Sequence, residues 1–172
     1  YQLVWFGVVI FAARGLPWLS VSLAAVFALG QWQLSRQRVS DGRLLACAVA
    51  LGIVLDGSLA GSGLLRYASP SPALLAPAWI LALWAAFAMT LNHSLTFLRG
   101  RPAVAAAFGA VGGPLAYAGA ARGFDAVAFA APAWPALLAL GIGWASAMAL
   151  LAALAQRWHG DVHAASFVEI AR

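Results

Sequence analysis

The chain has 172 residues, of which 64% are hydrophobic and 9% charged, with a mean hydropathy of +0.89. About a quarter of the residues of a soluble domain are charged, so this composition excludes an ordinary soluble enzyme. The net charge of +5 comes from scattered arginines, which is not typical of a nucleic-acid-binding surface, and the single cysteine, Cys47, excludes a disulfide framework.

The sequence predicts an all-α, polytopic transmembrane helical bundle of about six spans. A helix needs roughly 20 apolar residues to cross a bilayer. The predicted spans are residues 2–13, 18–34, 43–60, 77–98, 102–121 and 135–155. The first run is short, and we expect residues upstream of Tyr1 to complete it. A five-span alternative lays residues 1–14 flat on the membrane. Residues 1–157 form one transmembrane domain in this interpretation, followed by a short polar tail at 158–172.

Arginines in the breaks between spans predict the orientation. With six spans, one side carries Arg36, Arg38, Arg43, Arg99, Arg101, Arg157 and Arg172, and the other carries Arg14, Arg66 and Arg122. Short cytoplasmic loops are enriched in Lys and Arg, so both termini are predicted to be cytoplasmic. Basic residues at helix ends also suit anionic lipid headgroups. Abundant alanine and the absence of lysine are typical of a GC-rich bacterium, so the predicted location is the bacterial inner membrane.

Small residues in the fifth span predict how the bundle packs. Lipid provides no hydrophobic driving force for helices to associate. Close packing of the helix backbones must therefore hold the bundle together. One row contains Ala105, Gly109 and Gly113, and an adjacent row contains Gly112, Ala116 and Ala120. The sixth span repeats the spacing at Gly141, Ala145, Ala149 and Ala153, so these two spans are predicted to pack together. Pro114 either kinks the fifth span beside a cavity or, as we favour, is structural.

Asp56 is the main candidate for chemistry, because a charged residue within a span is costly and suggests function. It is predicted to lie about three turns into the third span. An ionised carboxylate there needs a partner or water, and otherwise protonates. Arg14 and Arg66 are expected on the same side. Two interpretations stay open: a proton-coupling or ligand-binding acid, or a buried Asp–Arg pair that fixes helix register.

A second polar group, Asn92-His93-Ser94, is predicted about one turn inside the cytoplasmic end of the fourth span. His93 is a candidate proton carrier, axial ligand to a pigment or haem, or interhelical hydrogen-bond partner. A haem of the cytochrome b type generally takes two membrane histidines, so the hydrogen-bond role is favoured. The predicted depths of His93 and Asp56 differ by roughly 10 Å, which argues against a catalytic pair.

Other polar residues give weaker signals. His159, Asp161 and His163 share a face in an extended strand, as metal ligands do, but a solvated tail is the preferred interpretation and no metal site is predicted. No nucleophile arrangement is visible. The paired carboxylates of hydrolases are also missing, since Asp41 falls in a predicted loop and Asp161 and Glu169 fall in the tail.

Several segments in this order resemble a bacterial family of small inner-membrane proteins catalogued as domain of unknown function 2878. They are Arg14-Gly15-Leu16-Pro17-Trp18, Leu55-Asp56-Gly57-Ser58, Leu65-Arg66-Tyr67, Thr90-Leu91-Asn92-His93-Ser94-Leu95 and Gly112-Gly113-Pro114-Leu115-Ala116-Tyr117. The resemblance covers nearly the whole chain. It implies a multi-span inner-membrane protein with no assigned reaction. It marks Arg14, Asp56, Arg66, Asn92, His93 and Tyr117 as positions of interest without giving any of them a role.

Three functions follow from these features. The preferred one is a non-enzymatic accessory or scaffold subunit that packs against a larger membrane complex or binds lipid or pigment. The second is a membrane-embedded enzyme or accessory of lipid modification, with His93 as general base. The third is a small proton-linked transporter that uses Asp56.

Overall fold

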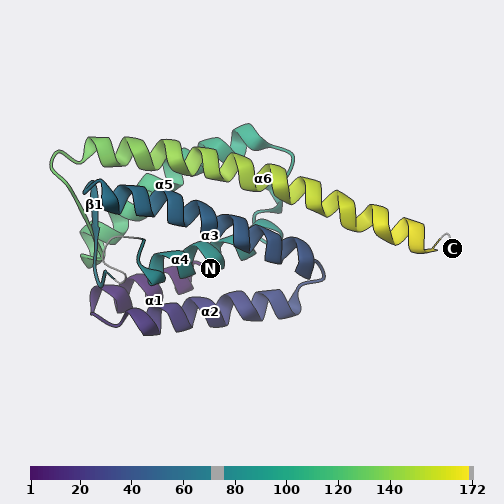
Figure 1. Cartoon of the computed structure of the whole chain (residues 1–172), viewed down its shortest axis with the longest axis horizontal. Helices are drawn as coiled ribbons and strands as arrows, with labels where there is room; N and C mark the ends of the chain where they lie inside the picture. Colours follow the sequence, from purple (N-terminus) through teal and green to yellow (C-terminus); the bar gives the residue numbers. More distant parts are fainter. Residues whose placement is uncertain (71–75, 171–172) are drawn as a thin grey trace.

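A computed structural model describes residues 1–70 and 76–170, with side chains described up to residue 158. In that part of the chain, six α-helices form a bundle (Figure 1). Their bounds are α1 Gln2–Ala13, α2 Pro17–Leu34, α3 Arg38–Gly61, α4 Ala78–Leu91, α5 Pro102–Phe124 and α6 Trp134–Ile170. A 3-10 turn, η1 (Thr96–Leu98), and two short strands, β1 (Leu65–Tyr67) and β2 (Val127–Phe129), complete the described elements.

Helix α4 is the centre of the bundle. It packs against α2 and α3 and touches α1 and α6. Ten of its fourteen residues are buried, among them Trp79, Trp84 and Met89. At 1.5 Å per residue, α4 is about 21 Å long, which is shorter than the roughly 30 Å of bilayer hydrocarbon. A short helix is tolerated there because protein, rather than lipid, surrounds its ends.

The two strands close one end of the bundle, where only helices and loops were expected. They pair antiparallel, with Arg66 opposite Ala128. Leu65 and Tyr67 are buried and Arg66 is exposed, as the two-residue period of a strand requires. The pairing gives hydrogen-bond partners to backbone N–H and C=O groups in the α3–α4 and α5–α6 connections. A prediction of helices alone provides no partners for these groups.

The helix limits differ most from the predicted ones in three places. Helix α3 starts at Arg38 rather than 43, because Asp41 lies in its first turn, where a negative charge suits the helix dipole. Helix α4 ends at Leu91 rather than 98, because the chain turns back and the Leu95 N–H donates to the Thr90 carbonyl at 2.8 Å. Helix α6 continues past residue 155 to Ile170; the side chains of His159, Asp161 and His163 lie outside the described residues.

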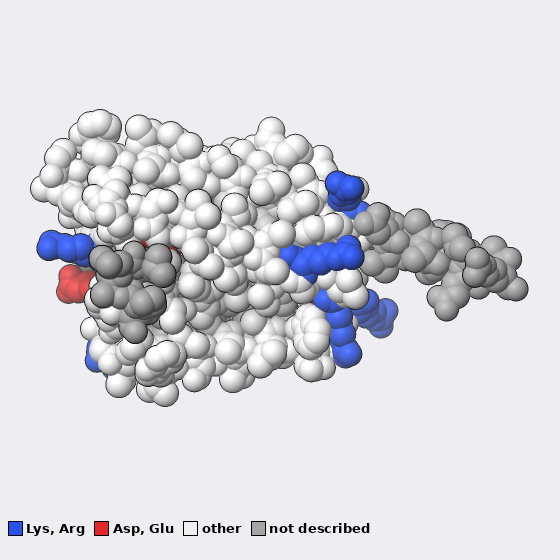
Figure 2. Space-filling view, viewed as in Figure 1, with Lys and Arg blue, Asp and Glu red and all other residues white. Residues whose placement is uncertain are grey.

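Three of the described helices are long and apolar enough to cross a membrane: α3, α5 and the Trp134–Trp158 part of α6. Helices α1 and α4 are apolar but shorter. By helix length and apolar composition, the described residues therefore support three membrane spans and not the six expected from the sequence. Figure 2 shows the basic side chains at the two ends of the bundle, with an uncharged surface between them on this face. An uncharged surface of this kind suits a bilayer interior, where a charge costs several kcal/mol.

Candidate functional site

Asp56 lies at the centre of a buried hydrogen-bond network that joins four elements. Its side chain is fully buried on α3. Oδ1 accepts hydrogen bonds from the Tyr67 hydroxyl of β1, at 2.7 Å, and from the Tyr117 hydroxyl of α5. Oδ2 accepts from the Trp84 indole N–H of α4, also at 2.7 Å. Three donors on one carboxylate provide the partners that a buried acid needs.

The interpretation of Asp56 as part of a buried Asp–Arg pair is wrong. Arg14 and Arg66 are both exposed, and no ion pair to Asp56 exists among the described side chains. Arg66 points outward because Tyr67, the next residue of β1, points inward to the carboxylate. The neutral side chains of two tyrosines and one tryptophan take the place expected for a cation.

The buried environment of this site shifts the pKa of the Tyr67 phenol. Burial, and then the neighbouring Asp56 carboxylate, raise its pKa well above the usual value. Both causes favour the protonated phenol, which is the form that donates a hydrogen bond. The network is therefore stable with Tyr67 neutral.

A glycine on α3 makes room for the tryptophan of this network. Gly52 lies one turn before Asp56, and a Cβ there would overlap the Trp84 indole ring, only 2.7 Å from its Cγ. Trp84 thus lies flat against the α3 backbone and reaches the carboxylate with its N–H. Neither Gly52 nor Trp84 was singled out in the sequence.

The predicted contact between the fifth and sixth spans is confirmed, since α5 packs closely against α6. Gly109 and Gly113 lie against Trp144 of α6, and Gly109 also lies against Met148. A Cβ at Gly141 would lie 3.4 Å from the Ala110 carbonyl oxygen, the group that Pro114 deprives of its usual donor. The contact face of α6 is Gly141, Trp144 and Met148. Ala153 of the predicted alanine row is exposed.

A cavity of about 780 Å³ lies between α1, α4, α5 and α6. We call it the groove. Its wall is rich in aromatic side chains, which are Tyr1, Trp5, Phe6, Trp79, Trp84, Phe87, Phe108, Tyr117, Phe124 and Trp144. Gly112 borders it, and a Cβ there would meet only a Phe108 ring carbon, at 4.0 Å. The volume falls in the range of pockets that hold one small organic molecule.

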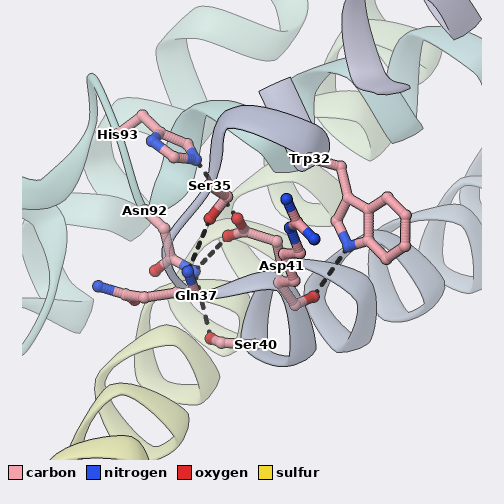
Figure 3. Close-up of polar contacts among 8 residues, drawn as sticks. Trp32, Ser35, Gln37, Ser40, Asp41, Asn92 and His93 are labelled. Carbon is pink, nitrogen blue, oxygen red and sulfur yellow. Dashed lines mark hydrogen bonds and ion pairs between the residues drawn. The ribbon is translucent and has the colours of Figure 1, made fainter. Parts of the chain in front are cut away.

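A second polar cluster joins α3 to the end of α4 (Figure 3). The Asn92 side-chain amide donates to Asp41 Oδ1 at 2.7 Å and to Ser40 Oγ at 3.2 Å. His93 Nε2 lies 3.4 Å from Asp41 Oδ2. Asp41 is fully buried although it was expected in a loop. We call these four residues the α3–α4 latch.

The connection between α2 and α3 supports this latch from one side (Figure 3). The Trp32 indole N–H donates to the Arg38 carbonyl at 2.9 Å, and the Gln37 N–H donates to Ser35 Oγ at 2.9 Å. These bonds fix the first turn of α3, which carries Ser40 and Asp41. The geometry of the latch therefore depends on a short turn as well as on two helices.

Asn92 and His93 lie after the end of α4 rather than one turn inside it, and Asn92 is its C-terminal cap. His93 and Asp56 contact different sets of side chains. His93 does not line the groove, and Asp41 faces its Nε2. This arrangement favours a polar contact between helices over ligation of a pigment or haem.

The sequence alone identified Asp56, Asn92 and His93 but missed their main partners: Tyr67, Trp84, Ser40 and Asp41. One signal was available for Tyr67, because Leu65 and Tyr67 flank Arg66 with strand-like alternation. Asp41 was assigned to a loop because the polar residues around it hid the start of α3.

The helical fold, the uncharged surface between the two ends and the three span-like helices define the class: a helical membrane protein. Within this class, the chain belongs to the family described as "Protein of unknown function (DUF2878)", whose model matches residues 1–150. The same comparisons gave no match among curated proteins or among solved structures.

Proposed function

We propose that this chain is a non-enzymatic accessory protein of the bacterial inner membrane that binds an apolar molecule from the lipid phase in its groove. The observation that carries the proposal is the groove itself: about 780 Å³ of aromatic and apolar lining within a membrane helix bundle. A cavity of this size and lining favours a hydrophobic ligand.

The proposed topology is six helices crossing the membrane, with both termini cytoplasmic. Arg43 stacks 5.8 Å from the Trp158 ring, and a Cβ at Gly100 would lie 3.7 Å from Gln156, which brings three arginine-bearing segments to one end. At the other end, Ser69 donates to the Ala12 carbonyl at 3.0 Å. The more basic end is proposed as the cytoplasmic one. Impermeant thiol labelling of single cysteines placed at residues 36 and 122 tests this, with label expected from outside only at 122.

The Asp56 network supports a non-enzymatic role. Asp56 is saturated by three donors and does not line the groove. A carboxylate in that state holds elements together, and transport by Asp56 would first require these bonds to open. The network therefore favours a structural acid over a proton carrier.

The test is to purify the protein in mild detergent and identify retained lipids by mass spectrometry. Gly112→Leu places a side chain in the groove from a position where an added Cβ would meet only a Phe108 ring carbon, at 4.0 Å. Val111→Leu is the matched control, since Val111 is 60% exposed and does not line the groove. We expect the wild type and Val111→Leu to retain the same molecule and Gly112→Leu to lose it. Equal retention by both variants, or none by the wild type, overturns the proposal.

One observation favours a second candidate, a lipid-modifying enzyme. His93 faces the buried Asp41 carboxylate, an arrangement that orients an imidazole for general base chemistry. The side chain of His93 is 34% exposed. Lipid profiles of a deletion strain complemented with wild type or His93→Gln test this. A difference confined to the His93→Gln strain supports the enzyme, and identical profiles exclude it.

A further inference from the structure

The lining of the groove restricts the charge of its ligand. Among the described residues that border the groove, none is Arg, Lys, Asp, Glu or His. A charged group moved into such a site without a partner costs several kcal/mol. The chain has ten basic residues, yet none of them borders the groove in the part of the chain that the structure describes. A phosphate headgroup would find no counter-charge there.

Polar side chains gather at one end of the groove. Gln2, Thr90 and Ser94 border it, and the Tyr1 ring lies 5.7 Å from that of Phe87. This contact places the start of α1 beside the last turn of α4, so Gln2 and Ser94 belong to the same end. Thr90 already donates to the Phe87 carbonyl at 2.6 Å. Among the described side chains, those of Gln2 and Ser94 make no hydrogen bond and are exposed.

The rest of the groove is suited to a long apolar body. From Phe108 to Phe124, the α5 residues that border it span about 24 Å at 1.5 Å per residue. Val127 and Trp79 border the groove at the far end from Ser94. Phe108, Gly112 and Ala116 repeat every four residues along this wall, so they lie on one face of α5 and form a continuous apolar track.

We infer that the groove binds an uncharged long-chain lipid with a carbonyl or hydroxyl head, placed beside Gln2 and Ser94, and with its chain along α5. An amide and a hydroxyl each donate and accept, so they recognise a neutral oxygen-bearing head. A phospholipid fits poorly, because a charged head within the groove has no partner among the lining residues. This inference rests on the proposed function and adds the chemical class of the ligand.

Tryptophans in the wall provide a direct readout. Trp5, Trp79, Trp84 and Trp144 border the groove, and bromine atoms on a bound chain quench indole fluorescence on contact. The probes are a dibrominated stearyl alcohol and a phosphatidylcholine that carries the same brominated chains, each added to the full chain in detergent. We expect saturable quenching by the alcohol and only weak, unsaturable quenching by the phospholipid.

Two variants locate the head and the chain. Ser94→Ala removes one proposed hydrogen bond to the head of the alcohol. It should lower the affinity for the alcohol about five-fold, which corresponds to roughly 1 kcal/mol. Gly112→Leu should abolish saturable quenching, whereas Val111→Leu should leave it unchanged. Equal quenching by both probes, or an unchanged affinity in Ser94→Ala, overturns the head-group inference while leaving lipid binding intact. The absence of saturable quenching by either probe overturns the proposed function as well.

Discussion

The indole of Trp84 stacks on the indole of Trp144, with ring centroids 4.2 Å apart and planes inclined by 11°. Gly52 of α3 lies against the outer face of Trp84, and Gly113 of α5 lies against Trp144. Two rings and two glycines thus form one layer across α3, α4, α6 and α5. Trp84 also donates to Asp56, so the layer connects the buried network to the wall of the groove.

The first prediction concerns the glycines of this layer. Gly113→Ala should lower the free energy of unfolding by about 1–3 kcal/mol, because the added methyl overlaps the Trp144 ring in a packed interior. Gly112→Ala is the control on the same helix, since the added methyl would meet only a Phe108 ring carbon, at 4.0 Å. Denaturant unfolding in detergent, followed by tryptophan fluorescence, measures both. Equal stability of the two variants contradicts the packing described for Trp144.

The second prediction concerns the carboxylate of Asp56. Asp56→Ala should destabilise the bundle by about 3–5 kcal/mol, because it leaves two hydroxyls and one indole N–H buried without an acceptor. Asp56→Asn keeps the shape and one acceptor oxygen, so a smaller loss is expected. Asp125→Asn is the control, since Asp125 is exposed. Thermal unfolding checks the order; a fully stable Asp56→Ala protein would falsify the structural role.

The third prediction concerns alkaline pH. The pKa of Tyr67 is raised in the folded protein by burial and by Asp56, whereas an unfolded tyrosine ionises near about pH 10. Above that pH the unfolded state binds fewer protons, so stability falls as pH rises, by roughly 1.4 kcal/mol per unit for this one group. The contribution of Tyr67 to the free energy of unfolding is therefore fully present below about pH 10 and is lost as the pH rises above it.

Tyr67→Phe isolates this effect. The variant loses a hydrogen bond and is less stable at every pH, but its stability should fall less steeply in alkali than that of the wild type. Unfolding free energies measured on both sides of the unfolded tyrosine pKa give the two slopes. Parallel slopes would show that Tyr67 ionises equally in both states.

The fourth prediction concerns the α3–α4 latch. Asn92→Leu removes the amide that donates to Asp41 and Ser40, which leaves a buried carboxylate short of partners and should cost about 2–3 kcal/mol. His93→Gln should cost less than about 1 kcal/mol, because its contact is partly exposed. Hydrogen exchange of the first turn of α3 should rise in Asn92→Leu and stay nearly unchanged in His93→Gln. The reverse order would show that His93 is the principal partner of Asp41.

The sequence by itself determined that this is a helical membrane protein with a small-residue contact between α5 and α6. Those properties depend on local composition and spacing: apolar runs, arginine at their ends, and glycine every four residues. It also singled out Asp56, Asn92 and His93, because polar residues stand out in an apolar background.

Only the tertiary structure decided what those residues touch. Tyr67 and Trp84 reach Asp56 from 11 and 28 residues away along the chain, and Tyr117 from 61, so no local pattern links them. An arginine partner was one of two interpretations that the sequence left open, and neutral donors satisfy the carboxylate instead. The groove was equally hidden, because it arises from the way α1 and α5 lie around α4, and that depends on side-chain packing rather than on the period of any one helix.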